Sequence, residues 1–158
     1  MLRTCPFPAC ALLVVFLAAA CTGSDDLTTN TASSTFAVKA EKLAFLHRYV
    51  LSTPGLLDAE YSIVYKDNSG GMVPGPSDWD IRLAAHVDPD SALAWTAGMR
   101  EDTLQASMAS WSELITDKDT LAFSGVSRTF RSAGKLVVMD ARHVTVLARY
   151  STMPMNGQ

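Results

Sequence analysis

The chain has 158 residues, with 13 basic and 16 acidic side chains and a formal net charge of −3 at pH 7. This length suits one domain with its own core, and the acidic balance argues against a nucleic-acid partner, which requires a basic surface. The three cysteines, Cys5, Cys10 and Cys21, all lie near the start of the chain. The remainder therefore has no disulfide, no thiol nucleophile and no thiolate metal site.

Residues 1–20 have the plan of a secretory signal peptide. Arg3 supplies positive charge near the amino terminus, and the stretch from Ala9 to Ala20 is uncharged with an apolar centre. Small residues follow that centre, as at a signal cleavage site. The apolar stretch is too short for a membrane-spanning helix, which needs about 20 residues. We expect these residues to be removed.

The segment Leu17-Ala18-Ala19-Ala20-Cys21 resembles a bacterial lipobox, although Ala18 stands where the usual pattern has leucine. The resemblance implies cleavage before Cys21, attachment of diacylglycerol to its sulfur and acylation of the new amino terminus. Several acyl chains give stable anchoring. The implied location is the cell membrane or outer membrane, with the domain facing the periplasm or exterior. The alternative is an ordinary signal peptide with a cysteine at the cut.

Residues 21–34 are predicted to form a lipidated tether. Thr, Ser, Asn, Gly and Asp dominate there, and Leu27 is the only large apolar residue. Such a composition buries too little apolar surface to offset the entropy of ordering the chain. A single domain is expected over residues 35–152, followed by a loose tail at 153–158.

The first half of the domain shows one helical and two strand patterns. Apolar residues recur at helical spacing from Phe36 to Leu51, which Pro54-Gly55 ends. Alternation predicts strands over 58–67 and 79–88. In the second strand, Trp79 and every second residue to Val87 share one face, and Asp80 begins the opposite, polar set.

The second half is predicted to be two helices and then three strands. Asp88-Pro89-Asp90 is a helix start with a capping aspartate, and Gly98 is expected to end that helix. A second helix is predicted over residues 102–115. Strands are predicted over 126–130, 135–139 and 143–150. The order is α-β-β-α-α-β-β-β. We therefore expect an α+β fold, a two-layer sandwich in which two or three helices cover an antiparallel sheet of about five strands.

The connection between the first two strands is the candidate binding loop, because loops carried on a rigid sheet often hold binding residues. It is rich in Gly, Pro and oxygen-bearing side chains. The candidate residues are Asp67, Asn68, Ser69, Gly70, Gly71, Pro74, Gly75, Pro76, Asp78, Trp79 and Asp80. Their spacing does not match a calcium-binding loop. The alternative is a structural loop whose side chains hydrogen-bond their own backbone.

Catalytic and metal signatures are weak. Asp80 and His86 lie on the strand predicted over 79–88, and Asp78 directly precedes it; these three residues form one possible hydrolase set, without an evident nucleophile. His47, His86 and His143 have no metal-ligand spacing, so no cofactor is expected.

Basic residues accumulate toward the C-terminus, where a basic sheet could face acidic lipid headgroups or an acidic partner; the alternative is a solvated face. These residues are Arg128, Arg131, Lys135, Arg142 and Arg149, against Asp140 alone.

Taken together, these patterns favour a membrane-tethered, non-catalytic domain that binds a protein partner in the cell envelope, for example an immunity-type or inhibitor-type lipoprotein. Two alternatives remain. One is an envelope hydrolase that uses Asp78, Asp80 and His86. The other is a small-ligand carrier, which requires an apolar cavity between sheet and helices.

Overall fold

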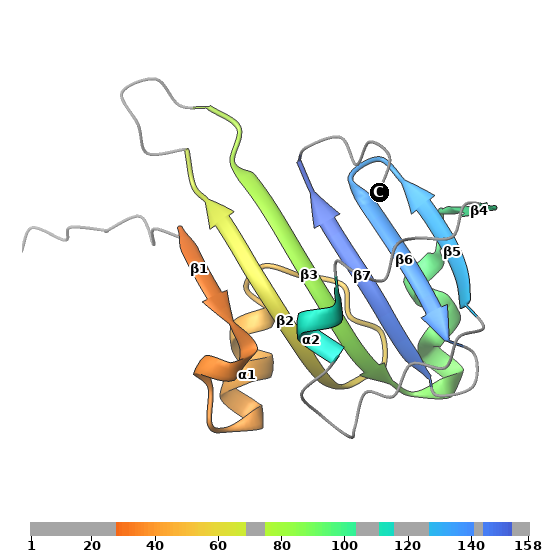
Figure 1. Cartoon of the computed structure of the whole chain (residues 1–158), viewed down its shortest axis with the longest axis horizontal. Helices are drawn as coiled ribbons and strands as arrows, with labels where there is room; N and C mark the ends of the chain where they lie inside the picture. Colours follow the sequence, from red (N-terminus) through yellow and green to blue (C-terminus); the bar gives the residue numbers. More distant parts are fainter. Residues whose placement is uncertain (1–27, 69–74, 104–110, 116–126, 141–143, 153–158) are drawn as a thin grey trace, which may run out of the picture.

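A computed structural model describes residues 28–68, 75–103, 111–115, 127–140 and 144–152. Their dominant element is one seven-stranded antiparallel sheet in the order β1-β2-β3-β7-β6-β5-β4 (Figure 1). The strands are β1 (Thr29–Ala32), β2 (Leu56–Lys66), β3 (Asp78–Val87), β4 (Arg100–Asp102), β5 (Ser127–Ser132), β6 (Lys135–Asp140) and β7 (Thr145–Ser151).

The predicted alternation along the central strands is confirmed. In β3, Ile81, Leu83 and Val87 are buried on one face. Tyr61 and Ile63 of β2 lie on the same face, because Tyr61 pairs with Leu83 and Ile63 with Ile81. Alternate residues on paired strands point to the same side of a sheet, so these side chains build one continuous core.

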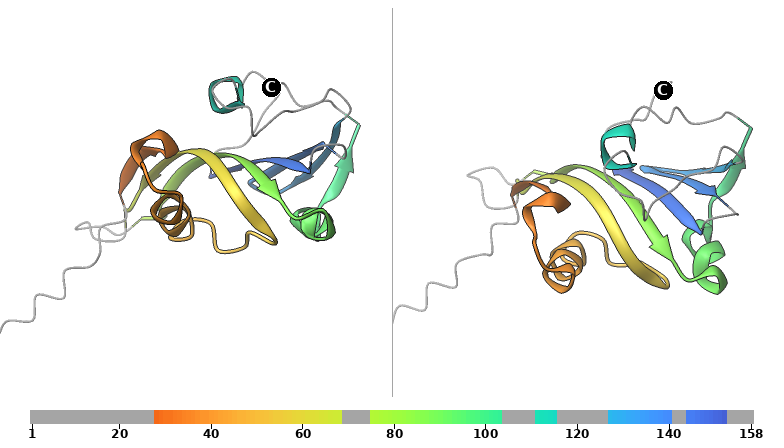
Figure 2. Two further views of the ribbon diagram at one scale, coloured as in Figure 1. Left: turned by 90° about the horizontal axis from the view of Figure 1, so that it is seen from below. Right: turned by 60° about the horizontal axis from the view of Figure 1, so that its bottom comes forward.

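The two faces of the sheet carry separate cores. The larger one contains the set just described and packs under α1 (Lys39–Leu46) and the 3-10 helix η2 (Pro89–Thr96), around which the sheet curves (Figure 2). The smaller one lies on the opposite face, where Trp111 precedes α2 (Ser112–Ile115) and packs with Leu136 and Leu147. Both faces of β3, β6 and β7 are therefore covered.

The fold-class prediction is wrong in its proportions. The described residues form seven strands where about five were expected, and their α-helices are only α1, with eight residues, and α2, with four. The molecule is a β-rich, single-sheet fold, not an α+β sandwich. Both unexpected strands, β1 and β4, are edge strands made of polar or small residues. An edge strand of this kind has no apolar alternation to reveal it, because neither of its faces needs to enter the core.

The helix predictions also need correction. The helix expected over residues 36–51 is limited to Lys39–Leu46, and a short 3-10 helix, η1 (Ser33–Thr35), precedes it. The helix after Asp88 is a 3-10 helix, although the predicted cap is present: the Asp88 side chain accepts from Asp90 N. Of the helix expected over 102–115, the described part contains the end of β4 and α2, and residues 104–110 lie outside the described residues.

The expected tether overlaps the domain. Thr29–Ala32 falls within the predicted tether, but it forms strand β1 and pairs with β2. Thr29 lies opposite Tyr65, and Ala32 lies opposite Ser62. Ser33 is buried and donates to Glu60 Oε2 at 2.5 Å. The ordered domain thus begins before residue 35, because β2 supplies backbone partners that composition cannot reveal. Cys21 and the tail at 153–158 lie outside the described residues.

A largely buried charge cluster joins α1 to β2. Lys42 Nζ lies 2.9 Å from Glu60 Oε1 and 2.7 Å from Asp58 Oδ1. Burial alone would lower the pKa of Lys42, but the hydrogen bonds to Asp58 and Glu60 outweigh it and raise that pKa. The Tyr61 hydroxyl donates to the Lys42 carbonyl at 2.9 Å, which attaches the same turn of α1 to β2.

Candidate functional site

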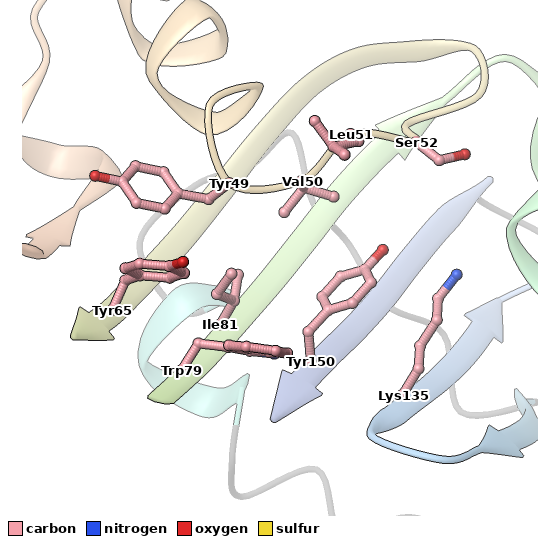
Figure 3. Close-up of a pocket in the computed structure, with 9 residues that line it drawn as sticks. All are labelled: Tyr49, Val50, Leu51, Ser52, Tyr65, Trp79, Ile81, Lys135 and Tyr150. Carbon is pink, nitrogen blue, oxygen red and sulfur yellow. The ribbon is translucent and has the colours of Figure 1, made fainter. Parts of the chain in front are cut away.

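An apolar pocket of about 370 Å³ lies on the α1 side of the sheet, between the strand ends and the segment that follows α1 (Figure 3). This feature is called the aromatic pocket below. Its lining residues come from five segments that are distant in the sequence. They are Tyr49, Val50, Leu51, Ser52, Tyr65, Trp79, Ile81, Lys135 and Tyr150.

Strand register brings the floor of the aromatic pocket together. Tyr65 of β2 pairs with Trp79 of β3. One step further along the sheet, Ile81 of β3 pairs with Tyr150 of β7, which in turn pairs with Lys135 of β6. Since directly paired residues project from the same face, all five side chains stand on one side of the sheet.

The segment after α1 forms the opposite wall. The amides of Tyr49 and Val50 both donate to the Leu46 carbonyl at 3.0 Å, which turns the chain back over the sheet. Val50 is buried, whereas the Leu51 side chain is 94% exposed. This wall therefore contributes two apolar side chains to the pocket, the buried one of Val50 and the exposed one of Leu51.

Stacked aromatic rings form one end of the pocket. The Tyr65 and Trp79 rings lie 6.2 Å apart and nearly parallel, at 11°. Tyr49 tilts against Tyr65 at 5.3 Å, and Phe45 of α1 lies 5.2 Å from Tyr49. Trp79 remains 36% exposed. Preformed aromatic surfaces that keep some exposure are typical of sites that bind flat apolar groups.

Lys135 and Tyr150 give the other end its polar character. Lys135 Nζ donates to the Trp95 carbonyl at 2.9 Å and lies 5.3 Å from the centre of the Tyr150 ring. Burial lowers the pKa of Lys135 and raises the pKa of Tyr150 to about 12. The Tyr150 hydroxyl is buried and has no hydrogen-bond partner within the described part of the chain.

Among its described residues, the predicted binding loop contributes one side chain to the pocket. Trp79 lines it, while the neighbouring polar residues bond within the loop: Asn68 Nδ2 donates to the Pro76 carbonyl at 2.9 Å, and Ser77 Oγ to Asp67 Oδ1 at 3.3 Å. Gly75 N donates to the Asn68 carbonyl. The described ends of this loop thus have the self-bonded arrangement weighed as the structural alternative. Ser69, Gly70, Gly71 and Pro74 lie outside the described residues.

The possible hydrolase set is not assembled. Asp80 accepts bidentate hydrogen bonds from Arg149, at 2.9 and 3.2 Å, on the sheet face opposite the aromatic pocket. His86 is six residues further along β3, which at about 3.3 Å per residue places it roughly 20 Å away. Asp78 Oδ1 accepts from Thr152 Oγ1 at 3.4 Å. No convergent acid–base pair forms among these three residues.

Most of the C-terminal basic residues have acidic or backbone partners. Arg128 makes two hydrogen bonds to Glu101, and Arg131 pairs with Asp102. Arg149 pairs with Asp80, as above. Carboxylates of β3 and β4 thus neutralise the arginines of the predicted basic face. Lys135 differs from them, because it has no carboxylate partner in the described part of the chain. Arg142 and His143 lie outside the described residues.

Three searches for related proteins give no match: no family model matches the chain, and neither a curated protein nor a solved structure does. Within the described residues, no group of three or more His, Cys, Asp or Glu side chains is placed to hold a metal ion. Nor does any described helix have the length and apolarity needed to cross a bilayer. Function is therefore inferred from the geometry of the aromatic pocket.

The sequence patterns do not predict the pocket, because they place most of its aromatic residues in the core and assign Trp79 to the loop and Lys135 to the basic face. Tyr65 and Tyr150 fit the apolar sets of their strands, and Tyr49 fits the helical stripe. The available signal was Lys135, which occupies the same face as Val137 and Met139 in β6. A lysine in an apolar row marks the point where that face meets solvent or a ligand.

Proposed function

We propose that this chain is an exported, lipid-anchored binding domain whose aromatic pocket captures a small apolar ligand without transforming it. The single observation that carries the proposal is the pocket itself. Its volume of about 370 Å³ lies in the range of small-molecule sites, and its walls combine aromatic surface with a few polar groups. The absence of an assembled hydrolase set favours binding over catalysis.

This proposal brings forward the alternative that requires an apolar cavity between the sheet and the helices. The aromatic pocket supports it in part: the pocket lies on the α1 side of the sheet, but its wall opposite β2, β3, β6 and β7 is the segment after α1 and not a helix. The rings of Tyr65 and Trp79 stack against each other, with their centres 6.2 Å apart. Aromatic side chains held in place by their neighbours lose less freedom on binding, which reduces the cost of capturing a ligand.

Anchoring through Cys21 belongs to the same proposal and depends on the lipobox resemblance. A lipid-anchored domain would hold a captured ligand close to the membrane surface of the cell envelope. Intact-mass analysis of the native product is expected to show a chain that begins at Cys21 and carries acyl groups. An unprocessed start, or an unmodified thiol at residue 21, would remove the anchor from the proposal without touching the pocket.

A protein partner is the second candidate, and the exposure of Leu51 favours it. Leu51 is 94% exposed at the rim of the aromatic pocket, and Trp79 is also accessible there. Interface hot spots are enriched in Trp and Tyr, so Trp79 would be the anchor of such an interface and Leu51 part of the apolar surface around it. In this version the pocket would receive a side chain of an envelope protein. Cross-linking from the pocket rim in intact cells, with no product above the untreated background, would argue against it.

The small-ligand proposal can be tested with N-phenylnaphthylamine, a neutral apolar dye that fluoresces when it leaves water. We expect saturable binding by the folded chain and its loss in Trp79→Ala, since that change removes one stacked ring. Leu93→Ala is the matched control, because Leu93 is 67% exposed and does not line the pocket. Circular dichroism checks that each variant is folded. Dye binding that Trp79→Ala leaves unchanged would refute the assignment of the site.

A further inference from the structure

The Tyr150 hydroxyl is a donor that has no acceptor among the described residues. It is buried at the polar end of the aromatic pocket, and no hydrogen-bond partner lies within reach among the described residues. An unsatisfied buried hydroxyl costs stability, so its presence at a pocket wall requires an explanation. A bound acceptor atom would provide that explanation.

Lys135 is the second donor at this end. Its ammonium uses one of three N–H groups on the Trp95 carbonyl, at 2.9 Å. The described residues offer it no carboxylate, unlike Arg128, Arg131 and Arg149, which all have one. Within the described residues, the positive charge of Lys135 thus has no carboxylate partner beside the apolar pocket.

The two donors point the same way. Figure 3 shows the Lys135 ammonium and the Tyr150 hydroxyl extending in one direction from neighbouring strands, beneath the segment that carries Leu51 and Ser52. Lys135 also lies over the Tyr150 ring, at 5.3 Å. Because the lysine side chain is long and flexible, its ammonium can turn toward an acceptor that also reaches the hydroxyl. One anionic group placed between them would satisfy both donors.

We propose that the ligand of the aromatic pocket is an apolar organic acid, whose flat or hydrocarbon body lies against Tyr65 and Trp79 and whose carboxylate or sulfonate is held by Lys135 and Tyr150. This inference rests on the function proposed above and specifies the ligand class. Charge-assisted hydrogen bonds from two donors, one of them cationic, select the anion over a neutral analogue. The stacked rings supply the apolar contact.

Two dyes with the same skeleton separate these contributions. Anilinonaphthalene sulfonate carries an anionic group on the framework of neutral N-phenylnaphthylamine. We expect the folded chain to bind the sulfonate at least about tenfold more tightly, as expected for hydrogen bonds to a charged group. Lys135→Met and Tyr150→Phe should each remove most of that preference while changing the affinity for the neutral dye less than about twofold. Fluorescence titration measures both dyes on every variant.

Lys66→Met is the matched control, since Lys66 is an exposed lysine of β2 outside the pocket lining. It should leave both affinities unchanged. Tyr150→Phe keeps the ring and serves if Lys135→Met does not fold. Equal affinity for the two dyes, or a sulfonate preference that survives both variants, would overturn the organic-acid inference while the pocket stands. Failure of both dyes to bind the wild-type chain would overturn the proposed function and this inference together.

Discussion

Lys135 and Tyr150 face each other across the β6–β7 pair, with the lysine ammonium 5.3 Å from the centre of the tyrosine ring. The ring is held by its strand, whereas the ammonium is at the end of a flexible side chain attached to the Trp95 carbonyl. The Tyr150 ring is therefore a fixed apolar surface, and the Lys135 ammonium beside it is a cation that can move. This relationship gives the aromatic pocket its polar end, and it leads to the first prediction.

Tyr150→Phe is expected to leave the free energy of unfolding unchanged or to raise it by up to about 1 kcal/mol, because it removes a buried hydroxyl without a partner. Tyr61→Phe is the matched comparison. It should cost about 1 kcal/mol, since the Tyr61 hydroxyl donates to the Lys42 carbonyl at 2.9 Å. Urea unfolding measures both. Equal destabilisation by the two changes would mean that Tyr150 has a partner after all.

Lys42→Met should be among the most destabilising changes in α1. It would leave Glu60, only 7% exposed, without its lysine partner, at a cost of about 3 to 5 kcal/mol. Replacing Glu60 with Gln in the same chain should recover part of that loss, which a double-mutant cycle measures. Lys39→Met, at an exposed position of the same helix, is the control and should have little effect. Additive effects of the two changes would show that the pair does not interact.

Asp58 makes the stability of the domain sensitive to acid. Burial alone would raise its pKa, but the hydrogen bonds from Lys42 and the Ala59 amide, with the positive charges of Lys42 and Lys39, together outweigh burial and lower the pKa below the ordinary value of 3.8. The unfolded chain therefore takes up a proton before the folded one does. The contribution of Asp58 is present above pH 3.8 and is lost as the pH falls through its lower folded pKa.

The difference in unfolding free energy between wild type and Asp58→Asn should consequently be largest near neutrality and shrink in strongly acidic buffer. Chemical unfolding over a pH series measures it. A difference that stays constant down to acidic pH would show that Lys42 and Asp58 are not paired.

Gly55→Ala should destabilise the domain more than Gly98→Ala. Both glycines have positive φ, of 60° and 74°, which costs an L-residue about 1 to 2 kcal/mol. A Cβ at Gly55 would also meet Ser91 Cβ at 2.3 Å, whereas the corresponding space at Gly98 is open. Thermal unfolding of the two variants tests this. Equal losses would indicate that the chain around Ser91 moves freely to make room.

The local patterns in the sequence determined the central strands and the helix start at Asp88. Alternation places Tyr61, Ile63, Ile81 and Leu83 on one face, because successive side chains in a strand point to opposite sides. Asp88 caps η2 through its own side chain, which needs only the next two residues. Such features depend on neighbours within one segment, so sequence alone can predict them.

Tertiary structure alone decided the edge strands and the aromatic pocket. Thr29–Ala32 becomes a strand only because β2 offers it backbone partners. Tyr65, Trp79, Tyr150 and Lys135 meet only because the sheet order places β7 between β3 and β6. Pairing between distant segments fixes strand order and register through backbone hydrogen bonds, which every residue type except proline can make in full. Side-chain patterns therefore predict which face a residue takes, while its neighbours on that face depend on the assembled sheet.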